Sequence, residues 1–449
     1  MAMYPYSMSL GRMCTVMLLA ACLLLGLATR DAESQVAAKG DSEMMHFPYP
    51  PDTRPAGCGT EDYNDMNFDN MTVSIVIPWL AEKWLHLRDT LEAILHFTPD
   101  HLIEEIIYVS DGNEDSKEKE LTAMSSKVKV IAFKERQGLI RAKMRGVQEA
   151  KAPVLMFMEA HCIVNRNWLQ PLLHRLVLHP KALAMPSLDF ISQTDWTSYT
   201  RAPAFHWRYE WNMNLVNSNP GGVIKDGPKP YISPGTSGGI FAMKREWFLH
   251  LGLFDVGMLE WGGDHFELTM KVWRCGGRIE IVPCARIGHL FRDPEHRPYE
   301  VEINQVVLNY KRLAEVWLKD HLPYFYRMKP EAVGMKLDSM EEVHKQHADL
   351  KCKSMKWYLE NVDHEMNWEM DKICHPYVNG KYKCKGKLAE GRFTVTNKDL
   401  ISRDEYIKRR KGVGEKKKKL AEAKKLAEEA FIKMKSLGGI FSEVSQEEL

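Results

Sequence analysis

Glu159 and His161 are the residues whose types and spacing first indicate chemistry. They lie at the end of the apolar run VLMFMEAHC, and in an extended strand two side chains separated by one residue point to the same side. A carboxylate and an imidazole placed in this way can share one divalent cation, which neutralises the charge that develops on a diphosphate leaving group. Mn2+ accepts such mixed oxygen and nitrogen ligands. An acid and a histidine at this spacing are usually structural, so their position at a strand end is what favours a metal site.

The segment at residues 260–292 indicates a site for a nucleotide sugar. It opens with a tryptophan and two glycines, and Asp264 and Glu267 follow at once. The glycines allow a tight turn and a close approach of the backbone to a ligand, and an aromatic face beside acids suits a sugar. Two structural interpretations stay open. The tryptophan can belong to the core, and the acids can favour the N-terminal dipole of a helix that begins near Asp264.

The preceding sequence alternates between apolar strands and helices, which is typical of an α/β fold with a mostly parallel sheet and crossover helices. In such sheets ligands bind beyond the carboxyl ends of the strands, here at residues 78–82, 111 and 159–161. A later segment, 189–234, is rich in Trp, Tyr, Asn and Pro. It is interpreted either as an irregular insertion with sugar or acceptor contacts or as aromatic packing over the sheet. The expected strands are 73–77, 105–109, 128–133 and 154–158, and the expected helices are about 82–97, a charged helix before the third strand, and about 139–150.

Composition restricts the class of protein. The chain has 449 residues and 45% hydrophobic content, which is enough to bury a core in one large domain or in two to three ordinary ones. Its 61 Lys and Arg against 60 Asp and Glu give a formal net charge of +1. No overall basic field therefore favours nucleic acid as a partner.

The N-terminus indicates entry into the secretory pathway. Residues 13–28 form an uncharged apolar run that is shorter than the roughly 20 residues that span a bilayer. Both a cleaved signal peptide and a short membrane anchor remain possible. A sequon, Asn70-Met71-Thr72, lies near the start of the first strand.

Nine cysteines fit that compartment. Two lie in the apolar run, and the other seven form an odd set, so at least one is expected to stay free. Their spacing lacks paired CxxC units, which argues against a zinc ribbon and favours disulfides. A disulfide between Cys374 and Cys384 is expected only because the two residues are close in the sequence.

Several segments together resemble the polypeptide N-acetylgalactosaminyltransferases. They are the WGG segment with its later PC and GH-x-FR elements, RQGLIRAKMRG at 136–146, SPGTSGGIFA from 233, LAEVW at 313–317 and CKSMKWYLENV at 352–362. The resemblance extends from about residue 72 to 362. No repeated QxW pattern of the lectin domain common in that family follows it.

The resemblance implies a GT-A fold and a retaining, Mn2+-dependent transfer from a UDP-sugar. It also implies disulfides between Cys58 and Cys284 and between Cys275 and Cys352. The site residues that it implies fall into three groups: metal ligands Glu159, His161 and His289; nucleotide-binding residues Glu82, Asp111, Arg136 and Tyr299; and catalytic residues Trp261, Asp264 and Arg292. Arg292 and Tyr299 match a loop that closes over UDP.

The chain departs from the family pattern inside the site. Glu159 stands where the family usually has Asp, and Asp264 stands where it usually has Glu. His265 replaces the usual Asn. Ser110 replaces the first of two acids, and Glu82 alone remains of an HNE triplet. A longer carboxylate at residue 159 shifts the position of a bound ion.

The expected function is transfer of a sugar, with GalNAc as the leading donor, to Ser or Thr of a polypeptide in the secretory lumen, with a Golgi anchor favoured by the resemblance. The alternatives are another UDP-sugar or a glycan acceptor, a secreted or lumenal enzyme after signal cleavage, and a catalytically silent lumenal binding protein of the same fold. The expected organisation is a signal segment at 1–30, a short stem at 31–71, a catalytic domain at 72–330, a Cys-containing extension at 331–400 and a basic amphipathic helical tail at 401–449.

Overall fold

The computed structural model describes residues 46–59, 68, 71–219, 222–293 and 295–369, and the backbone of four short strands between 375 and 394. The apolar run at 13–28, the sequon residue Asn70, Cys374, Cys384 and the tail at 401–449 lie outside the described residues. Among those that are described, no helix is long and apolar enough to cross a membrane.

The chain divides into two compact units, each described by itself. The first contains the described residues up to Trp317 together with Leu337–Asp363, and the second contains Leu318–Lys336 and the described residues from His364 onward. The second unit consists of η4 Lys319–His321, α9 Leu322–Met328, η5 Pro330–Ala332, α12 His364–Glu369, β13 His375–Pro376, β14 Tyr382–Lys383, β15 Lys385–Leu388 and β16 Gly391–Thr394.

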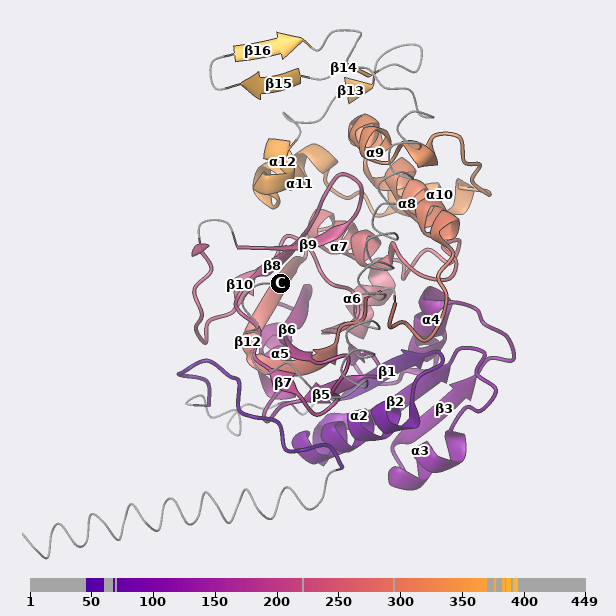
Figure 1. Cartoon of the computed structure of the whole chain (residues 1–449), viewed down its shortest axis with the longest axis vertical. Helices are drawn as coiled ribbons and strands as arrows, with labels where there is room; N and C mark the ends of the chain where they lie inside the picture. Colours follow the sequence, from indigo (N-terminus) through magenta and orange to yellow (C-terminus); the bar gives the residue numbers. More distant parts are fainter. Residues whose placement is uncertain are drawn as a thin grey trace, which may run out of the picture. The chain divides into compact units, whose positions relative to one another are not determined.

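The first unit holds the sheet and all the predicted site residues (Figure 1). Its elements are β1 Val73–Trp79, α2 Trp84–Phe97, η2 Asp100–Leu102, β2 Ile103–Ser110, α3 Glu118–Met124, β3 Val128–Ala132, α4 Leu139–Glu149, β4 Val154–Phe157, β5 Cys162–Val164, α5 Leu169–Leu178, β6 Ala182–Ile191, β7 Tyr199–Thr200, β8 His206–Tyr209, β9 Leu215–Ser218, β10 Tyr231–Ile232, β11 Phe241–Lys244, α6 Arg245–His250, α7 Asp264–Arg274, β12 Arg278–Leu290, α8 Ile303–Trp317, α10 Glu341–Asp349 and α11 Met355–Asn361.

The central sheet is mostly parallel, as predicted. Its strand order is β10-β12-β6-β11-β4-β1-β2-β3. Strands β3, β2, β1, β4, β6 and β12 run in one direction, and β11 runs in the opposite direction between β4 and β6. The predicted strands and helices between residues 73 and 158 are all present, and their ends differ by at most a few residues.

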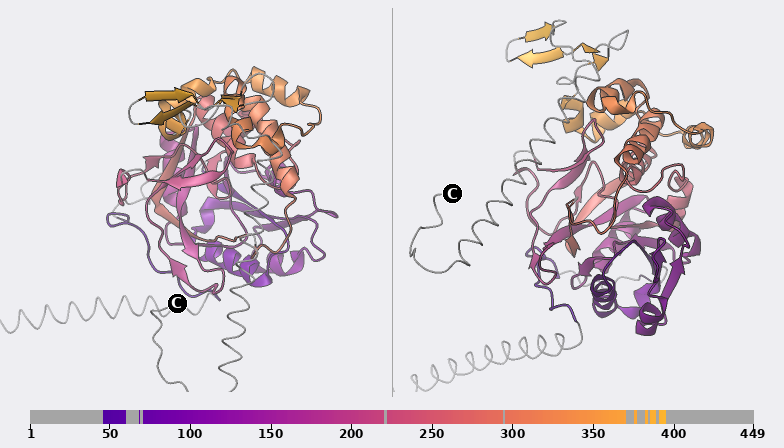
Figure 2. Two further views of the ribbon diagram at one scale, coloured as in Figure 1. Left: turned by 45° about the horizontal axis from the view of Figure 1, so that its top comes forward. Right: turned by 45° about the vertical axis from the view of Figure 1, so that its right-hand side comes forward.

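Strand β1 shows why the sheet forms here. All seven residues of VSIVIPW are buried, which is the continuous apolar pattern of a strand covered on both faces. Alternate residues such as Ile75 and Ile77 share one core with α2, α3 and α5. The intervening Val76 faces α4 on the opposite side. Figure 2 shows from two further directions that helices cover both faces of this part of the sheet.

The sheet brings the predicted site segments together. Strands β1 and β2 end level with each other, with Trp79 opposite Ser110, and β4 ends beside them. Strand β5 then pairs with the far end of β12, so that His289 lies opposite Cys162. The segments that follow β1, β2 and β4 therefore meet the C-terminal end of β12.

The aromatic segment at 189–234 is partly core. Tyr209 and Trp211 are buried, which supports the packing interpretation for these two residues. Strands β8 and β9 form a hairpin in which Tyr209 pairs with Leu215. Leu215 and its neighbours line a cavity described below, so the segment also reaches a candidate site.

Two disulfides join distant parts of the first unit. Cys58–Cys284 and Cys275–Cys352 are both formed, as the family resemblance implies, and Cys162 is free and buried. Residues 46–59 fall within the range predicted as a stem, and several of them contact the fold. Phe47 belongs to the core, and the Thr53 hydroxyl donates to buried Asp189 at 2.5 Å.

Gly146 allows α4 to approach the sheet closely. A Cβ atom at this residue would lie 2.3 Å from Cγ1 of Val76. We expect Gly146→Ala to lower the free energy of unfolding by about 1–3 kcal/mol because it overpacks this contact. At an ordinary position inside a helix, the same Gly→Ala change would instead raise the free energy of unfolding by about 0.5–1 kcal/mol. Chemical denaturation measures the difference.

Gly227→Ala is the matched control. A Cβ at Gly227 meets nothing within 4 Å, so its effect should stay within about 0.5 kcal/mol of zero. Stabilisation by Gly146→Ala would show that α4 does not pack on β1 as closely as described.

Candidate functional site

Two adjoining cavities lie at the carboxyl ends of the strands. The first has a volume of about 230 Å³, and the second about 450 Å³. Glu159 and Trp261 line both. The first cavity brings together all the predicted site residues except Asp264, namely Glu82, Asp111, Arg136, Glu159, His161, Trp261, His289, Arg292 and Tyr299. Asp264 lines the second cavity.

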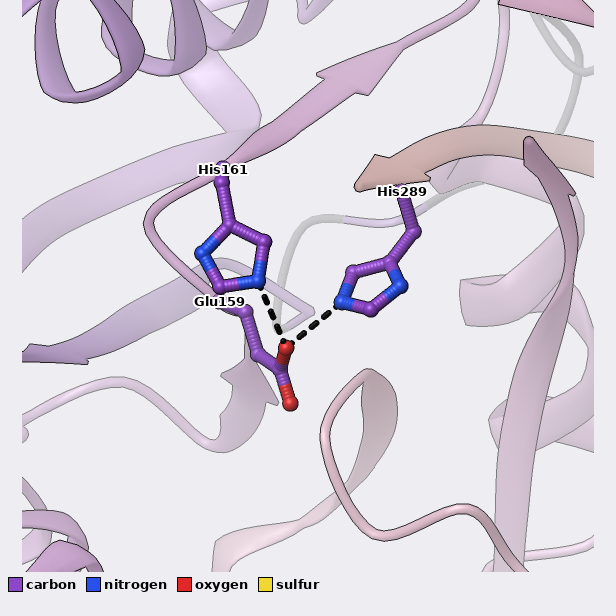
Figure 3. Close-up of side chains that lie close together, drawn as sticks. All are labelled: Glu159, His161 and His289. Atoms are coloured by element: carbon purple, nitrogen blue, oxygen red, sulfur yellow. Dashed lines mark hydrogen bonds and ion pairs between the residues drawn. The ribbon is translucent and has the colours of Figure 1, made fainter. Parts of the chain in front are cut away.

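Glu159, His161 and His289 form a group that could hold a metal ion. One ligand atom from each lies within 4.8 Å of the others. Oε2 of Glu159 is 3.1 Å from Nε2 of His161 and 2.6 Å from Nε2 of His289. Figure 3 shows both imidazoles directed at this carboxylate. The two imidazoles come from the segment before β5 and from the end of β12, and the pairing of these strands places them side by side.

The donor set of this group fits Mn2+. A carboxylate oxygen and two imidazole nitrogens converge, and Mn2+ accepts both types of ligand. Gly239 leaves room for the longer acid, since a Cβ there would lie 2.2 Å from Oε1 of Glu159.

The charges of Glu159, His161 and His289 influence one another. Burial opposes the charge on Glu159, but His289 and His161 outweigh it and hold the pKa of this carboxyl well below its usual range.

The two histidines differ in their environments. Burial lowers the pKa of His161, but hydrogen bonds to Glu159 and Glu82 outweigh this and raise that pKa overall. Burial dominates at His289 and lowers its pKa. Metal binding would require the neutral form of both imidazoles.

Glu82 lies behind the group as the centre of an ion-pair network. Its Oε1 accepts from Nδ1 of His86 and from Nη2 of Arg292, both at 2.5 Å. Its Oε2 accepts from Nδ1 of His161 and from Nη1 of Arg292, both at 2.9 Å. Two predicted residues with different assigned roles, Glu82 and Arg292, thus bind each other directly.

Asp111 organises the turn that begins α4. Its two oxygens accept from the backbone N–H groups of Gln137, at 2.6 Å, and of Gly138, at 2.9 Å. Burial raises the pKa of Asp111, although these hydrogen bonds and Arg136 partly offset that effect. The carboxylate therefore fixes the position of Arg136 at the edge of the first cavity.

Arg136 holds the segment that follows β12. Its Nη1 donates to the carbonyl of Glu300 at 3.1 Å, and its guanidinium lies 5.6 Å from the centre of the Tyr299 ring. Glu260 also holds this segment, since its Oε2 accepts a hydrogen bond from the backbone N–H of Glu302 at 3.2 Å. The predicted nucleotide residues Arg136 and Tyr299 are therefore in contact with each other.

The tryptophan and its two glycines form a turn with unusual backbone angles. Gly262 and Gly263 have φ of +92° and +103°, and Glu260 before them has φ of +56°. Asn309 on α8 fixes the turn, since its Nδ2 donates to the carbonyls of residues 259, 261 and 262 at 2.7–3.1 Å. The turn places Trp261 between the two cavities and starts α7 at Asp264.

Asp264 is held by a buried cation. Lys143 donates to its Oδ2 at 2.6 Å and to the carbonyl of Gly238 at 2.9 Å, and both side chains are almost fully buried. His265 lies 3.3 Å from the other oxygen, and its ring stacks on Tyr209. These polar groups form one wall of the second cavity.

Sequence reasoning did not identify Lys143, Glu260 or Arg297 as site residues. The sequence does contain an indication for Lys143, because this lysine lies on the apolar face of α4 between Ile140 and Val147. A buried lysine requires a partner of opposite charge. The sequence contains no such indication for Glu260 or Arg297. Arg297 lies 5.3 Å from the Trp261 ring only because the segment after β12 folds back over the cavity.

The Lys143–Asp264 pair predicts a specific acid sensitivity. Burial opposes the charge on Asp264, but Lys143 and His265 outweigh it, so the pKa of Asp264 lies below its ordinary value of 3.8. The unfolded chain then takes up the proton first, and the stability that this group provides is complete above pH 3.8 and lost as the pH falls further. We expect Asp264→Asn to flatten the decline in unfolding free energy below about pH 4.

At neutral pH the same change should lower the free energy of unfolding by about 3–5 kcal/mol, because it leaves Lys143 buried without its counter-charge. Urea denaturation at several pH values measures both effects. Asp338→Asn, at an exposed position, serves as the control and should keep the wild-type profile. An unchanged acid profile in Asp264→Asn would contradict the pair.

The chain is similar to known proteins in both sequence and structure. Residues 74–252 match the model of the glycosyl transferase family 2, and residues 225–296 match that of the N-terminal domain of galactosyltransferase. The chain is 36% identical over 341 residues to polypeptide N-acetylgalactosaminyltransferase 16 of Mus musculus, covering 74% of this chain and 60% of that protein.

Another relative is named as inactive. The chain is 37% identical over 328 residues to inactive polypeptide N-acetylgalactosaminyltransferase-like protein 5 of Macaca fascicularis, covering 70% of this chain and 72% of that protein. Across eight curated relatives the matched region spans 54% to 72% of their length.

The fold has a close counterpart among solved structures. The crystal structure of GalNAc-T7 with UDP, GalNAc and Mn2+ matches with a TM-score of 0.66 and 26% identity, covering 82% of this chain and 77% of that chain. This similarity and the mixed, mostly parallel sheet confirm the predicted GT-A fold.

Proposed function

This chain belongs to the polypeptide N-acetylgalactosaminyltransferase family, and on that premise we propose that it transfers GalNAc from UDP-GalNAc to Ser or Thr hydroxyls of polypeptides with the aid of Mn2+. The observation that carries the proposal is the convergence of Glu159, His161 and His289 on one point of the first cavity. Ligand groups for a divalent ion therefore lie in the same cavity as Asp111 and Arg136.

The nucleotide and the ion occupy the first cavity in this proposal. Glu159, His161 and His289 would hold Mn2+, and a bound ion would supply positive charge to the diphosphate. Asp111, which follows β2, and Arg136, in the turn before α4, position the uridine. Tyr299 lies over Arg136 and excludes water from the same side.

The sugar occupies the boundary between the cavities. Trp261 lines both and presents its aromatic face, while Asp264 lines the second cavity beside it. Lys143 and His265 fix the orientation of Asp264. A carboxylate held in this way orients a hydroxyl group of the donor with little loss of entropy on binding.

The described carboxylates favour a reaction without a protein nucleophile. The second cavity is lined by two of them, Glu159 and Asp264. Glu159 faces two histidines and Asp264 is bound by Lys143, so both are already engaged. We infer that the acceptor hydroxyl attacks from the side of the leaving phosphate, which takes up its proton, and that the anomeric configuration is retained.

Arg292 completes the site after a change of partner. In the described conformation its guanidinium forms two hydrogen bonds to Glu82. A bound diphosphate offers the same bidentate geometry to a guanidinium. Arg292 then neutralises charge on the departing UDP.

The secretory pathway is the proposed location. Two disulfides, Cys58–Cys284 and Cys275–Cys352, form within the first unit, and such bonds persist in oxidising compartments. A Golgi membrane anchor in the segment at 13–28 belongs to the same proposal.

A donor screen tests the proposed activity. We expect release of UDP from UDP-GalNAc in the presence of Mn2+ and a peptide panel, and its loss with a chelator. His289→Ala should weaken Mn2+ binding by about 10-fold or more, because removal of a ligand costs at least as much as removal of a group that orients one. Calorimetry with Mn2+ measures this step independently of turnover.

His344→Ala is the control for the metal measurement, since this histidine is exposed on α10. Turnover with UDP-glucose alone would overturn the GalNAc assignment. Equal Mn2+ affinity in His289→Ala and wild type would overturn the metal site.

A catalytically silent binding protein is the second candidate function. Its support is the replacement of a metal-ligand acid by Glu159, the engagement of Arg292 by Glu82, and the name of one relative as inactive. Binding of UDP and Mn2+ without turnover on a broad peptide panel would favour this function. Turnover gained in Glu159→Asp would then locate the defect at this residue, and turnover by the wild type would exclude the silent function.

A further inference from the structure

We propose that Glu82 is a positioning residue that orients His161 as a metal ligand rather than a residue that contacts the nucleotide. The inference rests on the metal site of the proposed function. It starts from the place of Glu82 in the structure, where its carboxylate stands directly behind His161.

The contacts of His161 give the inference its chemical content. Nδ1 of the ring donates to Oε2 of Glu82 at 2.9 Å, while Nε2 points toward Glu159 at 3.1 Å. A proton held on Nδ1 leaves the lone pair of the neutral ring on Nε2, which is the nitrogen of the candidate metal group. Carboxylates that accept a hydrogen bond from a ligating histidine fix its tautomer and ring orientation in this way.

Glu82 has no acceptor capacity left for a nucleotide in this conformation. An ionised carboxylate offers about four lone-pair positions. Arg292 occupies two of them, His86 occupies a third and His161 the fourth. The backbone N–H of Lys83 adds a longer hydrogen bond to Oε1 at 3.2 Å. Although Glu82 lines the first cavity, its charge is directed at protein groups, and His86 and His161 still hold one oxygen each when Arg292 turns to a diphosphate.

The surroundings also hold Glu82 rigidly. Its side chain is only 4% exposed. Ala81 before it has φ of +53° and donates its N–H to Oδ1 of Asn113 at 2.7 Å. His86, on the first turn of α2, packs against Trp196 with 4.3 Å between the ring centres and the two rings tilted by 41°. Because the preceding loop and helix α2 both hold Glu82 in place, Glu82 can in turn hold His161 in place.

The competing explanation is that Glu82 only neutralises Arg292. In that case Glu82 affects stability and the position of Arg292 but not the metal affinity. A background without the Arg292 charge separates the two explanations, because the ion pair is then absent from every variant compared.

The test measures Mn2+ affinity without nucleotide in the full chain, by calorimetry or by the electron paramagnetic resonance of free Mn2+. The series is Arg292→Met alone, Arg292→Met with Glu82→Met, and Arg292→Met with Glu82→Gln. Met has a similar volume but accepts no hydrogen bond, whereas the Gln carbonyl can still accept from Nδ1. We expect Glu82→Met to weaken Mn2+ binding by about 10- to 100-fold, and Glu82→Gln to restore part of that loss.

Binding of uridine, which lacks phosphates and needs no metal, is the second readout. It should stay within about two-fold of the Arg292→Met protein in all variants. Weaker uridine binding with unchanged Mn2+ affinity would overturn the inference in favour of a nucleotide contact. Equal Mn2+ affinity across the series would overturn it in favour of the purely structural role.

Thermal unfolding followed by circular dichroism checks that each variant is folded. If the double Met variant does not fold, the comparison of Arg292→Met with Glu82→Gln against Arg292→Met alone decides, because the loss of the Glu82 charge behind His161 should by itself weaken Mn2+ binding measurably. Failure of the wild type to bind Mn2+ would instead overturn the proposed metal site and this inference with it. That outcome is distinct from a wild type that binds Mn2+ with an affinity independent of Glu82.

Discussion

The pairing of β5 with the C-terminal end of β12 is the interaction on which the candidate site depends. Backbone hydrogen bonds set His289 opposite Cys162, one residue after His161, and so place two imidazoles from distant parts of the chain beside Glu159. The rest of the sheet supports this arrangement. β12 runs beside β6, and the segments after β1 and β2 meet at the same edge. A slip of one residue would turn His289 to the other face of the strand.

Buried charges form a second constraint, since each removes a charged group from water and requires a partner. The structure satisfies this requirement in pairs that connect separate elements. Lys143 on α4 binds Asp264 on α7, and Arg292 after β12 binds Glu82 before α2. These pairs tie the turn that carries Trp261 and the segment over the first cavity to the sheet. They also determine which polar groups stay available for a ligand, which is why Glu82 is better explained by His161 than by a nucleotide.

Much of the fold and most of the site followed from sequence patterns. Strand β1 was predicted because a short continuous apolar run is typical of a buried parallel strand. Asp111 and Glu159 were predicted as site residues because α/β sheets bind ligands at strand ends. The family resemblance supplied His289, Arg292 and two disulfides, which no local pattern contains. The sequence did not reveal the role of Glu260, which depends on a backbone with positive φ and on a segment about 40 residues later.

By itself the sequence determined the α/β class, the family and the residue types available for a nucleotide sugar and a metal, because these are properties of local periodicity and of recognisable segments. Only the tertiary structure decided which of those residues act on each other. Glu82 is separated from His161 by 79 residues and from Arg292 by 210, yet one carboxylate binds both. Such contacts depend on strand register and on the requirement that buried charges be paired, and both are fixed only when the whole sheet has formed.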